Sequence, residues 1–125
     1  SNLHPDAMIL FDSQHRPSHR QGEHEIIVPP RLESKTALLE FLKEALRLPD
    51  YFGYNWDALN DCLADISAGA EKYVLVHHDL PLESEPEEQR TYLEIVGHAA
   101  VAMERLDLVF PEAYRARISG IVKRP

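Results

Sequence analysis

Hydrophobic residues recur along this chain in short runs of the length of a β-strand. The runs at 7–11 and 25–28 fit strands, and the polar segment between them is broken by proline and glycine. The run from Tyr73 to His77 is almost continuously apolar, which predicts a strand buried on both faces of a parallel sheet. Leu106 to Phe110 fits a further parallel strand.

Other stretches keep the three- and four-residue spacing of apolar positions that is typical of helices. Ser34 is a candidate N-cap for the first helix, Asn55 for the second, and Pro86 suits the first turn of the third. Leu48-Pro49 should end the first helix, and Gly53 can supply a positive φ in the loop that follows. The predicted helices cover about 35–46, 56–66 and 86–105.

The predicted order from Glu25 onward is β–α–α–β–α–β, which indicates an α/β fold. We expect one domain over residues 1–125, with a small parallel sheet of about three strands covered by helices in two or three layers. The run at 7–11 would add an N-terminal edge strand. The tail at 111–122 fits a further helix, or an extra strand over 117–122, and the helix is slightly favoured.

The second predicted helix has two distinct stripes. Its apolar stripe contains Trp56, Leu59, Leu63 and Ile66, and the stripe beside it contains Asp57, Asn60, Asp61 and Ala64. Like charges four residues apart repel by roughly 0.2–0.5 kcal/mol, so helix stability does not explain the two acids. A solvated acidic surface is the plain alternative. Trp56 fits either the core or a contact surface, and Cys62 fits a small buried hydrophobe.

The same region resembles a known family. Residues 48–63 read Leu-Pro-Asp-Tyr-Phe-Gly-Tyr-Asn-Trp-Asp-Ala-Leu-Asn-Asp-Cys-Leu without a gap relative to the family pattern. This pattern is similar to that of the barstar family, small acidic inhibitors of barnase-type ribonucleases. The resemblance extends less strongly over about 25–110, and it implies a barstar-like fold and inhibition of a ribonuclease.

In that family the loop and helix block the ribonuclease active site, where carboxylates take the places of substrate phosphates. By position, the resemblance implies partner-binding roles for Tyr51, Gly53, Asp57 and Asp61. Asn60 occupies a position where an aromatic contact residue stands in the best-known pattern, and Ala64 and Ile66 replace other members of that surface. This departure leaves two alternatives open. Either the partner is a different ribonuclease, or the chain is a non-inhibitory module of the same fold that binds another basic protein.

The charge of the chain agrees with a basic protein partner. Thirteen Lys and Arg against 21 Asp and Glu give a formal net charge of −8, which disfavours direct binding of nucleic acid. Solubility alone explains the same charge. A single cysteine excludes an internal disulfide, and the sequence lacks an evident signal peptide or membrane span, so we expect a cytoplasmic protein with no membrane partner.

Weaker candidate sites lie elsewhere in the sequence. His4, His15, His19 and His24 offer imidazoles for a metal, but loop spacing fixes no geometry. His77, His78 and Asp79 follow a predicted strand, where open α/β sheets bind ligands. The acids Glu83, Glu85, Glu87 and Glu88 fit a solvated helix start that widens the negative field.

Enzyme motifs are missing from the sequence, including phosphate-binding and dinucleotide-binding glycine loops, a nucleophile elbow and a zinc-binding helix. A small hydrolase using Asp57, Asp61 or His78 is therefore only a third hypothesis. We expect no catalytic residues, no metal and no cofactor.

Overall fold

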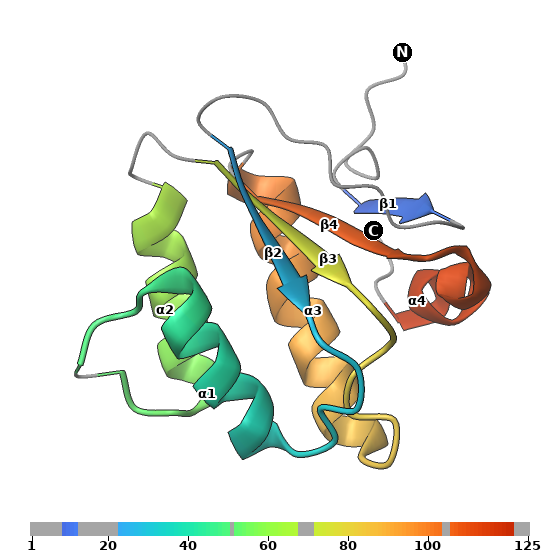
Figure 1. Ribbon diagram of the computed structural model, residues 1–125, viewed down its shortest axis with the longest axis horizontal. Coiled ribbons are helices and arrows are strands. Elements are labelled where there is room, and N and C mark those ends of the chain that lie inside the picture. The colour runs from blue at the N-terminus through green and yellow to red at the C-terminus, as the bar shows by residue number, and fades with distance from the viewer. Residues whose placement is uncertain (1–8, 13–22, 51, 68–71, 104–105, 122–125) are drawn as a thin grey trace.

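The computed structural model describes residues 9–12, 23–50, 52–67, 72–103 and 106–121 of the chain (Figure 1). The elements follow one another along the sequence as strands alternating with helices. They are β1 (Ile9–Asp12), β2 (Glu23–Val28), α1 (Lys35–Leu46), α2 (Trp56–Ser67), β3 (Lys72–His77), α3 (Pro86–Met103), β4 (Leu106–Pro111), the 3₁₀ turn η2 (Glu112–Tyr114) and α4 (Arg115–Ile121).

The sheet has four parallel strands in the order β1-β4-β3-β2. In register, Ile26 pairs with Leu75 and Leu75 pairs with Leu108. The predicted parallel sheet is therefore confirmed. The N-terminal edge strand is also present, starting at Ile9, and it pairs with β4 at Leu108. Ala7 and Met8 lie outside the described residues.

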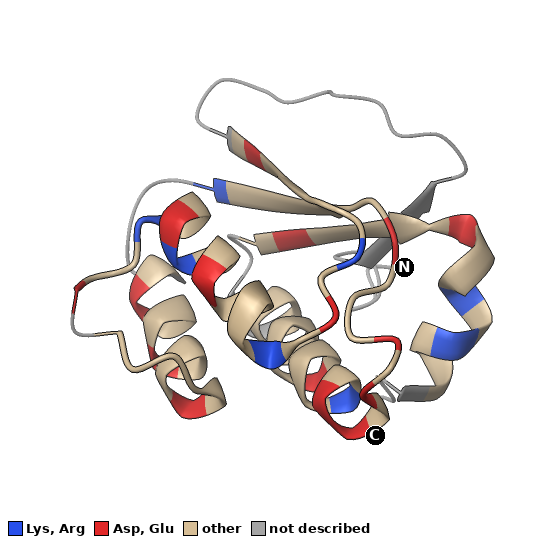
Figure 2. Ribbon diagram, turned by 60° about the horizontal axis from the view of Figure 1, so that its bottom comes forward, with Lys and Arg blue, Asp and Glu red and all other residues tan. Residues whose placement is uncertain are grey.

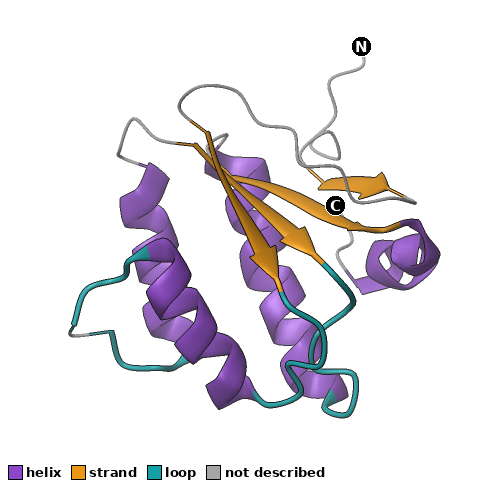
Figure 3. Cartoon of the chain, in the orientation of Figure 1, coloured by secondary structure: helices purple, strands orange, loops and turns teal. Residues whose placement is uncertain are grey.

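The helices α1, α2 and α3 lie on one face of the sheet (Figures 1 and 3). Alternate strand residues such as Val28, Leu75 and Leu108 face these helices and are at most 1% exposed. The described part of the chain therefore has two layers, a sheet and a helical layer. None of the helices in this part has the length and apolar character of a bilayer-crossing segment.

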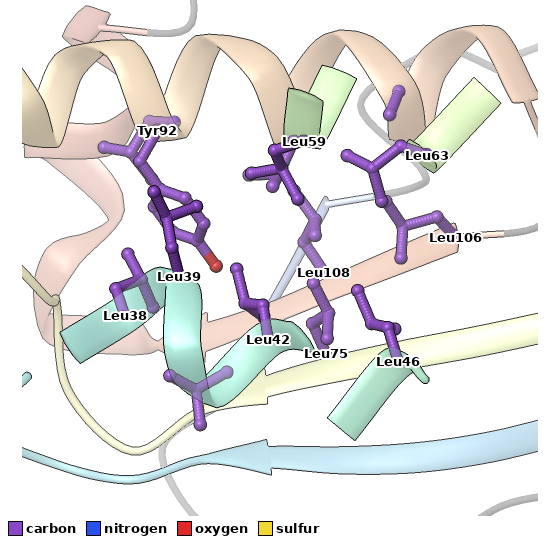
Figure 4. Packing of buried hydrophobic residues seen from close by; sticks show 14 of the residues in the cluster. Leu38, Leu39, Leu42, Leu46, Leu59, Leu63, Leu75, Tyr92, Leu106 and Leu108 are labelled. Carbon is purple, nitrogen blue, oxygen red and sulfur yellow. The ribbon is translucent and has the colours of Figure 1, made fainter. Parts of the chain in front are cut away.

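One hydrophobic core fills the space between the two layers. Figure 4 shows leucines of α1 and α2 interdigitating with strand residues and with Tyr92 of α3. Burying each leucine of this kind contributes about 1.5–3 kcal/mol to folding. The labelled members are Leu38, Leu39, Leu42, Leu46, Leu59, Leu63, Leu75, Tyr92, Leu106 and Leu108.

The local signals for α1 act as the sequence predicts. Ser34 is extended, and its Oγ accepts a hydrogen bond of 3.1 Å from Ala37 N–H at the start of α1. At the other end Arg47 adopts a left-handed conformation with φ of 56°, and its N–H bonds back to Glu44 and Lys43 carbonyls. The predicted helix at 35–46 is confirmed at both ends.

Two predictions needed adjustment in the second half of the chain. The tail forms η2 and α4, with Ile118 buried in the core, so the alternative of a strand over 117–122 is wrong within the described residues. Strand β3 was predicted to be buried on both faces. It is buried over Leu75 to His77 and half-buried over Lys72 to Val74. Helix α3 is described as far as Met103, and residues 104 and 105 lie outside the described part.

Candidate functional site

The loop between α1 and α2 is folded onto the core. Leu48 and Phe52 are 7% and 3% exposed, so the loop is held by two buried side chains. Phe52 N–H donates to Pro49 C=O at 2.9 Å, which closes a turn. The predicted proline stop after α1 therefore also sets the shape of the loop that precedes α2.

Among the described residues 52–55 of this loop the left-handed one is Tyr54, with φ of 55°, and not Gly53 as predicted. A Cβ on Gly53 would lie 3.1 Å from Asn55 Nδ2, tighter than most contacts of real Cβ atoms. The same Nδ2 donates to Gly53 C=O at 3.4 Å. Glycine at this position therefore makes room for the capping asparagine, and the prediction that Gly53 supplies a positive φ is wrong.

Asn55 caps α2 as predicted. Its Oδ1 accepts a hydrogen bond of 2.7 Å from Ala58 N–H, and its carbonyl accepts one of 3.1 Å from Leu59 N–H. The side chain therefore satisfies Ala58 N–H, an amide that would lack a partner in the first helical turn, and the Leu59 bond is the first of the helix itself. The cap fixes the position of the turn that carries Asp57.

The two sides of α2 have opposite characters. Leu59, Cys62 and Leu63 are at most 6% exposed and face the core. The residues of the other stripe are all exposed, namely Asp57, Asn60, Asp61 and Ala64, and Asp65 beside them is exposed too. The helix carries three acids and no Lys or Arg, and Figure 2 shows its charged positions in red alone. We call Asp57, Asn60 and Asp61 the acid face.

Neither carboxylate of the acid face is used inside the described part of the chain. The ion pairs found there join other residues, and none of them includes Asp57 or Asp61. Two like charges at i and i+4 on an exposed helix face are thus held close together without a cation from the described residues. Such a surface attracts a cationic partner over a Debye length of about 8 Å at physiological ionic strength.

Cys62 lies directly behind this surface. Burial and then the charges of Asp65 and Asp61 raise the pKa of its thiol above the usual value. The thiol therefore stays protonated and unreactive at neutral pH, in agreement with its interpretation as a small buried hydrophobe.

Trp56 lies at the edge of the core. The side chain is half-buried and packs against the core cluster. Its buried part fits the predicted core position, and its exposed part fits the predicted contact surface. Its Nε1–H donates to Glu88 Oε1 at 2.7 Å. Tyr51 lies outside the described residues, so its predicted contact role stays a prediction.

Tyr54 is a potential site residue that the sequence interpretation missed, and the bond of Glu88 to Trp56 was missed as well. Tyr54 is 44% exposed and its ring meets the buried ring of Phe52 edge-on, with centroids 5.2 Å apart. Its place between a glycine and a capping asparagine, outside any apolar periodicity, is a usable signal of exposure. Glu88 gave no local signal, because its partner lies 32 residues earlier in the chain.

The candidate at the end of β3 is mainly structural. His77 is 3% exposed, its ring stacks on Phe110 at 4.1 Å, and its Nδ1 lies 3.1 Å from Val109 C=O. Since a carbonyl only accepts, Nδ1 carries the proton, and Nε2 accepts from Tyr92 O–H at 2.7 Å. Burial lowers the pKa of His77 to about 4, so it is neutral at pH 7.

His78 and Asp79, which follow His77 in the sequence, link the loops after β2 and β3 by hydrogen bonds. His78 is exposed, and its backbone N–H donates to Val28 C=O at 3.0 Å. Asp79 Oδ2 accepts a hydrogen bond of 3.3 Å from Arg31 N–H. These bonds hold the loops after β2 and β3 together at the carboxyl end of the sheet.

The other candidate clusters are only partly described. His4, His15 and His19 lie outside the described residues, and the ring of His24 stacks on Tyr73 with centroids 5.1 Å apart. Within the described ranges, no three His, Cys, Asp or Glu side chains gather in a way that holds a metal ion. In the acid cluster, Glu83 pairs with Arg117 at 2.7 Å, whereas Glu85 and Glu87 are exposed.

A comparison with protein families identifies the family to which this chain belongs. A family model described as "Barstar (barnase inhibitor)" matches residues 27–112, which include the capped loop, α2, the strands β3 and β4 and the last two residues of β2. Comparisons with curated proteins and with solved structures give no match. The match spans more than half of the chain and contains the whole acid face, so this chain is a member of the barstar family.

Proposed function

We propose that this protein inhibits a basic ribonuclease of the barnase type by inserting the acid face of α2 into its active site. The observation that carries the proposal is the exposure of Asp57 and Asp61 on one side of a capped helix, with no ion pair to them in the described part of the chain. The family match supports a protein partner of this kind.

The chemistry of a ribonuclease site supports the choice of partner. Such a site holds phosphates with Arg and Lys donors, and these donors form charge-assisted hydrogen bonds equally well with carboxylates. Helix α2 presents its acids in a preorganised form, because Asn55 fixes the first turn and Leu59 and Leu63 anchor the helix to the core. Binding therefore requires little ordering of the inhibitor.

Within this proposal each residue of the surface has a distinct role. Asp61 meets the central basic groups of the enzyme, and Asp57 lies beside it. Tyr51 supplies a large rigid contact, Gly53 allows a close approach of the backbone, and Asn60 contributes a polar contact. Tyr54 adds an exposed aromatic ring at the edge of the same surface.

A second candidate is a non-inhibitory module that uses the same acid face to bind another basic protein. It is favoured by the polar Asn60, which is exposed at the middle of the face where an aromatic side chain would give a stronger anchor. The hydrolase hypothesis has less support. Acid–base catalysis by two carboxylates needs two different environments, and Asp57 and Asp61 share one exposed face.

The deciding experiment is an inhibition assay of the purified chain against a barnase-type ribonuclease, with Asp61→Ala as the test variant and Glu85→Gln as a matched loss of one exposed charge. We expect inhibition that weakens at high salt, is largely lost in Asp61→Ala and is retained in Glu85→Gln. Binding to the nuclease without loss of its activity would favour the second candidate. Equal losses in the two variants would refute the assignment to the acid face.

A further inference from the structure

The side chain of Trp56 connects the first turns of three helices. Its Nε1–H donates to Glu88 Oε1 at 2.7 Å, and its ring lies 6.1 Å from that of Tyr92, both residues of α3. Lys35 Nζ, in the first turn of α1, lies 5.7 Å from the indole centroid. We call Lys35, Trp56, Glu88 and Tyr92 the Trp56 clasp.

The contacts of the clasp are of the stronger kinds. The indole bond ends on a carboxylate and is half-buried, so it is charge-assisted and partly protected from water. The ammonium group of Lys35 lies over the same ring within the range of a cation–π interaction. Tyr92 is fully buried and is fixed in turn by its bond to His77, so the clasp rests on a rigid support.

The location of the clasp matters more than its strength. Trp56 is the first residue of α2, and Asp57 follows it directly. Helix ends fray before helix centres, and each residue of a helix turns by about 100° around the axis. Holding the indole of Trp56 in one orientation therefore fixes the direction of the Asp57 side chain, and of Asp61 one turn later.

We propose that Glu88 is a positioning residue for the acid face, acting through the indole of Trp56 and not through contact with the partner. The inference rests on the proposed function, since it assumes that a partner binds at α2. A residue that keeps the bound geometry populated changes the dissociation rate, whereas a charge that only attracts the partner changes the association rate.

The chain supplies a matched control one position away. Glu87 has the same charge and stands in the same first turn of α3, but it is exposed and makes no bond to the indole. Changes at Glu87 therefore report the loss of one negative charge near α2. Glutamine at position 88 removes the charge and keeps an oxygen that accepts from Trp56 Nε1, whereas leucine removes both.

The binding test measures association and dissociation rates of the barnase-type ribonuclease with the full chain and with Glu88→Leu, Glu88→Gln and Glu87→Leu. We expect Glu88→Leu to dissociate about tenfold faster, as for the loss of one hydrogen bond to a charged group. Glu87→Leu should dissociate at the rate of the unchanged protein, and Glu88→Gln, which keeps a weaker neutral hydrogen bond, at a rate between those of Glu88→Leu and the unchanged protein. Equal rates in Glu88→Leu and Glu87→Leu, or in Glu88→Leu and Glu88→Gln, would overturn the proposal.

A second measurement needs no partner and separates this inference from the proposed function. In Glu88→Leu we expect amide hydrogen exchange at Ala58 and Leu59 to rise about tenfold, while the amides of β3 and β4 keep their protection. Trp56 is the only tryptophan of the chain, so its fluorescence should shift to the red in the same variant.

Failure of the proposed function and failure of the Trp56 clasp therefore give different results. A chain that inhibits no ribonuclease refutes the proposed function, and the exchange data then decide the clasp alone. Unchanged exchange at Ala58 and Leu59 in Glu88→Leu would overturn the clasp even if inhibition is strong.

Discussion

Helices α1 and α2 are alike on the inside and different on the outside. Both have 12 residues and both bury leucines in the same core. Each also exposes two acids four positions apart, Glu40 and Glu44 on α1, Asp57 and Asp61 on α2. On α1 the acids share the helix with Lys43, which also lies 3.8 Å from Asp50, whereas α2 carries no basic residue.

The difference separates what the fold requires from what a partner requires. The inner faces are set by packing in the core. A face with charges of both signs compensates itself, but a face of one sign creates a field that reaches beyond the surface. In the proposed function, this contrast with α1 is what assigns the acids of α2 to a partner.

The largest expected effect comes from reversing the charges of Asp57 and Asp61, with Glu40 and Glu44 of α1 as the control pair. We expect Asp57→Lys with Asp61→Lys to weaken inhibition of a barnase-type ribonuclease by more than about 1000-fold, since unpairing charges in an interface costs about 2–5 kcal/mol each. Glu40→Lys with Glu44→Lys changes the net charge equally and should leave most of the inhibition. Comparable losses in the two double variants would reduce the comparison to net charge alone.

The inner faces should respond alike. Leu42 of α1 and Leu63 of α2 are each 1% exposed, and replacing either by alanine leaves a cavity. We expect each substitution to lower the free energy of unfolding by about 2–5 kcal/mol, measured by urea denaturation. If Leu63→Ala were nearly neutral, α2 would be an appendage and not an equal member of the core.

The core contacts of His77 should weaken in acid. His77 is held neutral among Tyr92 O–H, Val109 C=O and the Phe110 ring, with its pKa lowered to about 4 by burial. The unfolded chain binds this proton near pH 6.5, so stability is full above that pH and falls as the pH drops towards 4. The slope is about 1.4 kcal/mol per pH unit, and the loss is complete below the folded pKa at about 3 kcal/mol.

Urea denaturation between pH 7 and pH 4.5 checks this expectation. Glutamine at position 77 does not titrate, so His77→Gln should be less stable at pH 7 but should lose this part of the pH dependence. An identical slope in both proteins would assign the acid sensitivity to other groups.

Sequence patterns predicted the elements of this protein more closely than their contacts. The ends of α1 were predictable because Ser34 and Leu48-Pro49 are local signals, and the exposure of Asp57 and Asp61 followed from helical spacing. The left-handed conformation of Tyr54 was not predictable, since glycine is the usual residue there and the crowding by Asn55 is visible only in three dimensions.

The contacts between helices were out of reach for the same reason. Nothing near Glu88 in the sequence indicates a bond to Trp56, because the bond depends on how α2 and α3 pack. His77 ended a predicted strand and suggested a ligand site, whereas its partners are Tyr92 and Val109 from other elements. Local sequence determined what each segment forms, and the tertiary structure determined what its polar groups bind.

The smallest expected effect comes from removing the N-caps of the two helices, Ser34 of α1 and Asn55 of α2. Ser34→Ala and Asn55→Ala each remove one side-chain acceptor from a first-turn amide, so both should lower the free energy of unfolding by about 1 kcal/mol. Only Asn55→Ala should also raise the Kd for the ribonuclease, by about fivefold. This is because Asn55 shapes the turn that carries Asp57, while Ser34 shapes a helix whose outer face is compensated. Titration of both variants at one salt concentration measures this, and an equal rise of Kd in Ser34→Ala would mean that general stability, and not the local geometry of α2, controls binding.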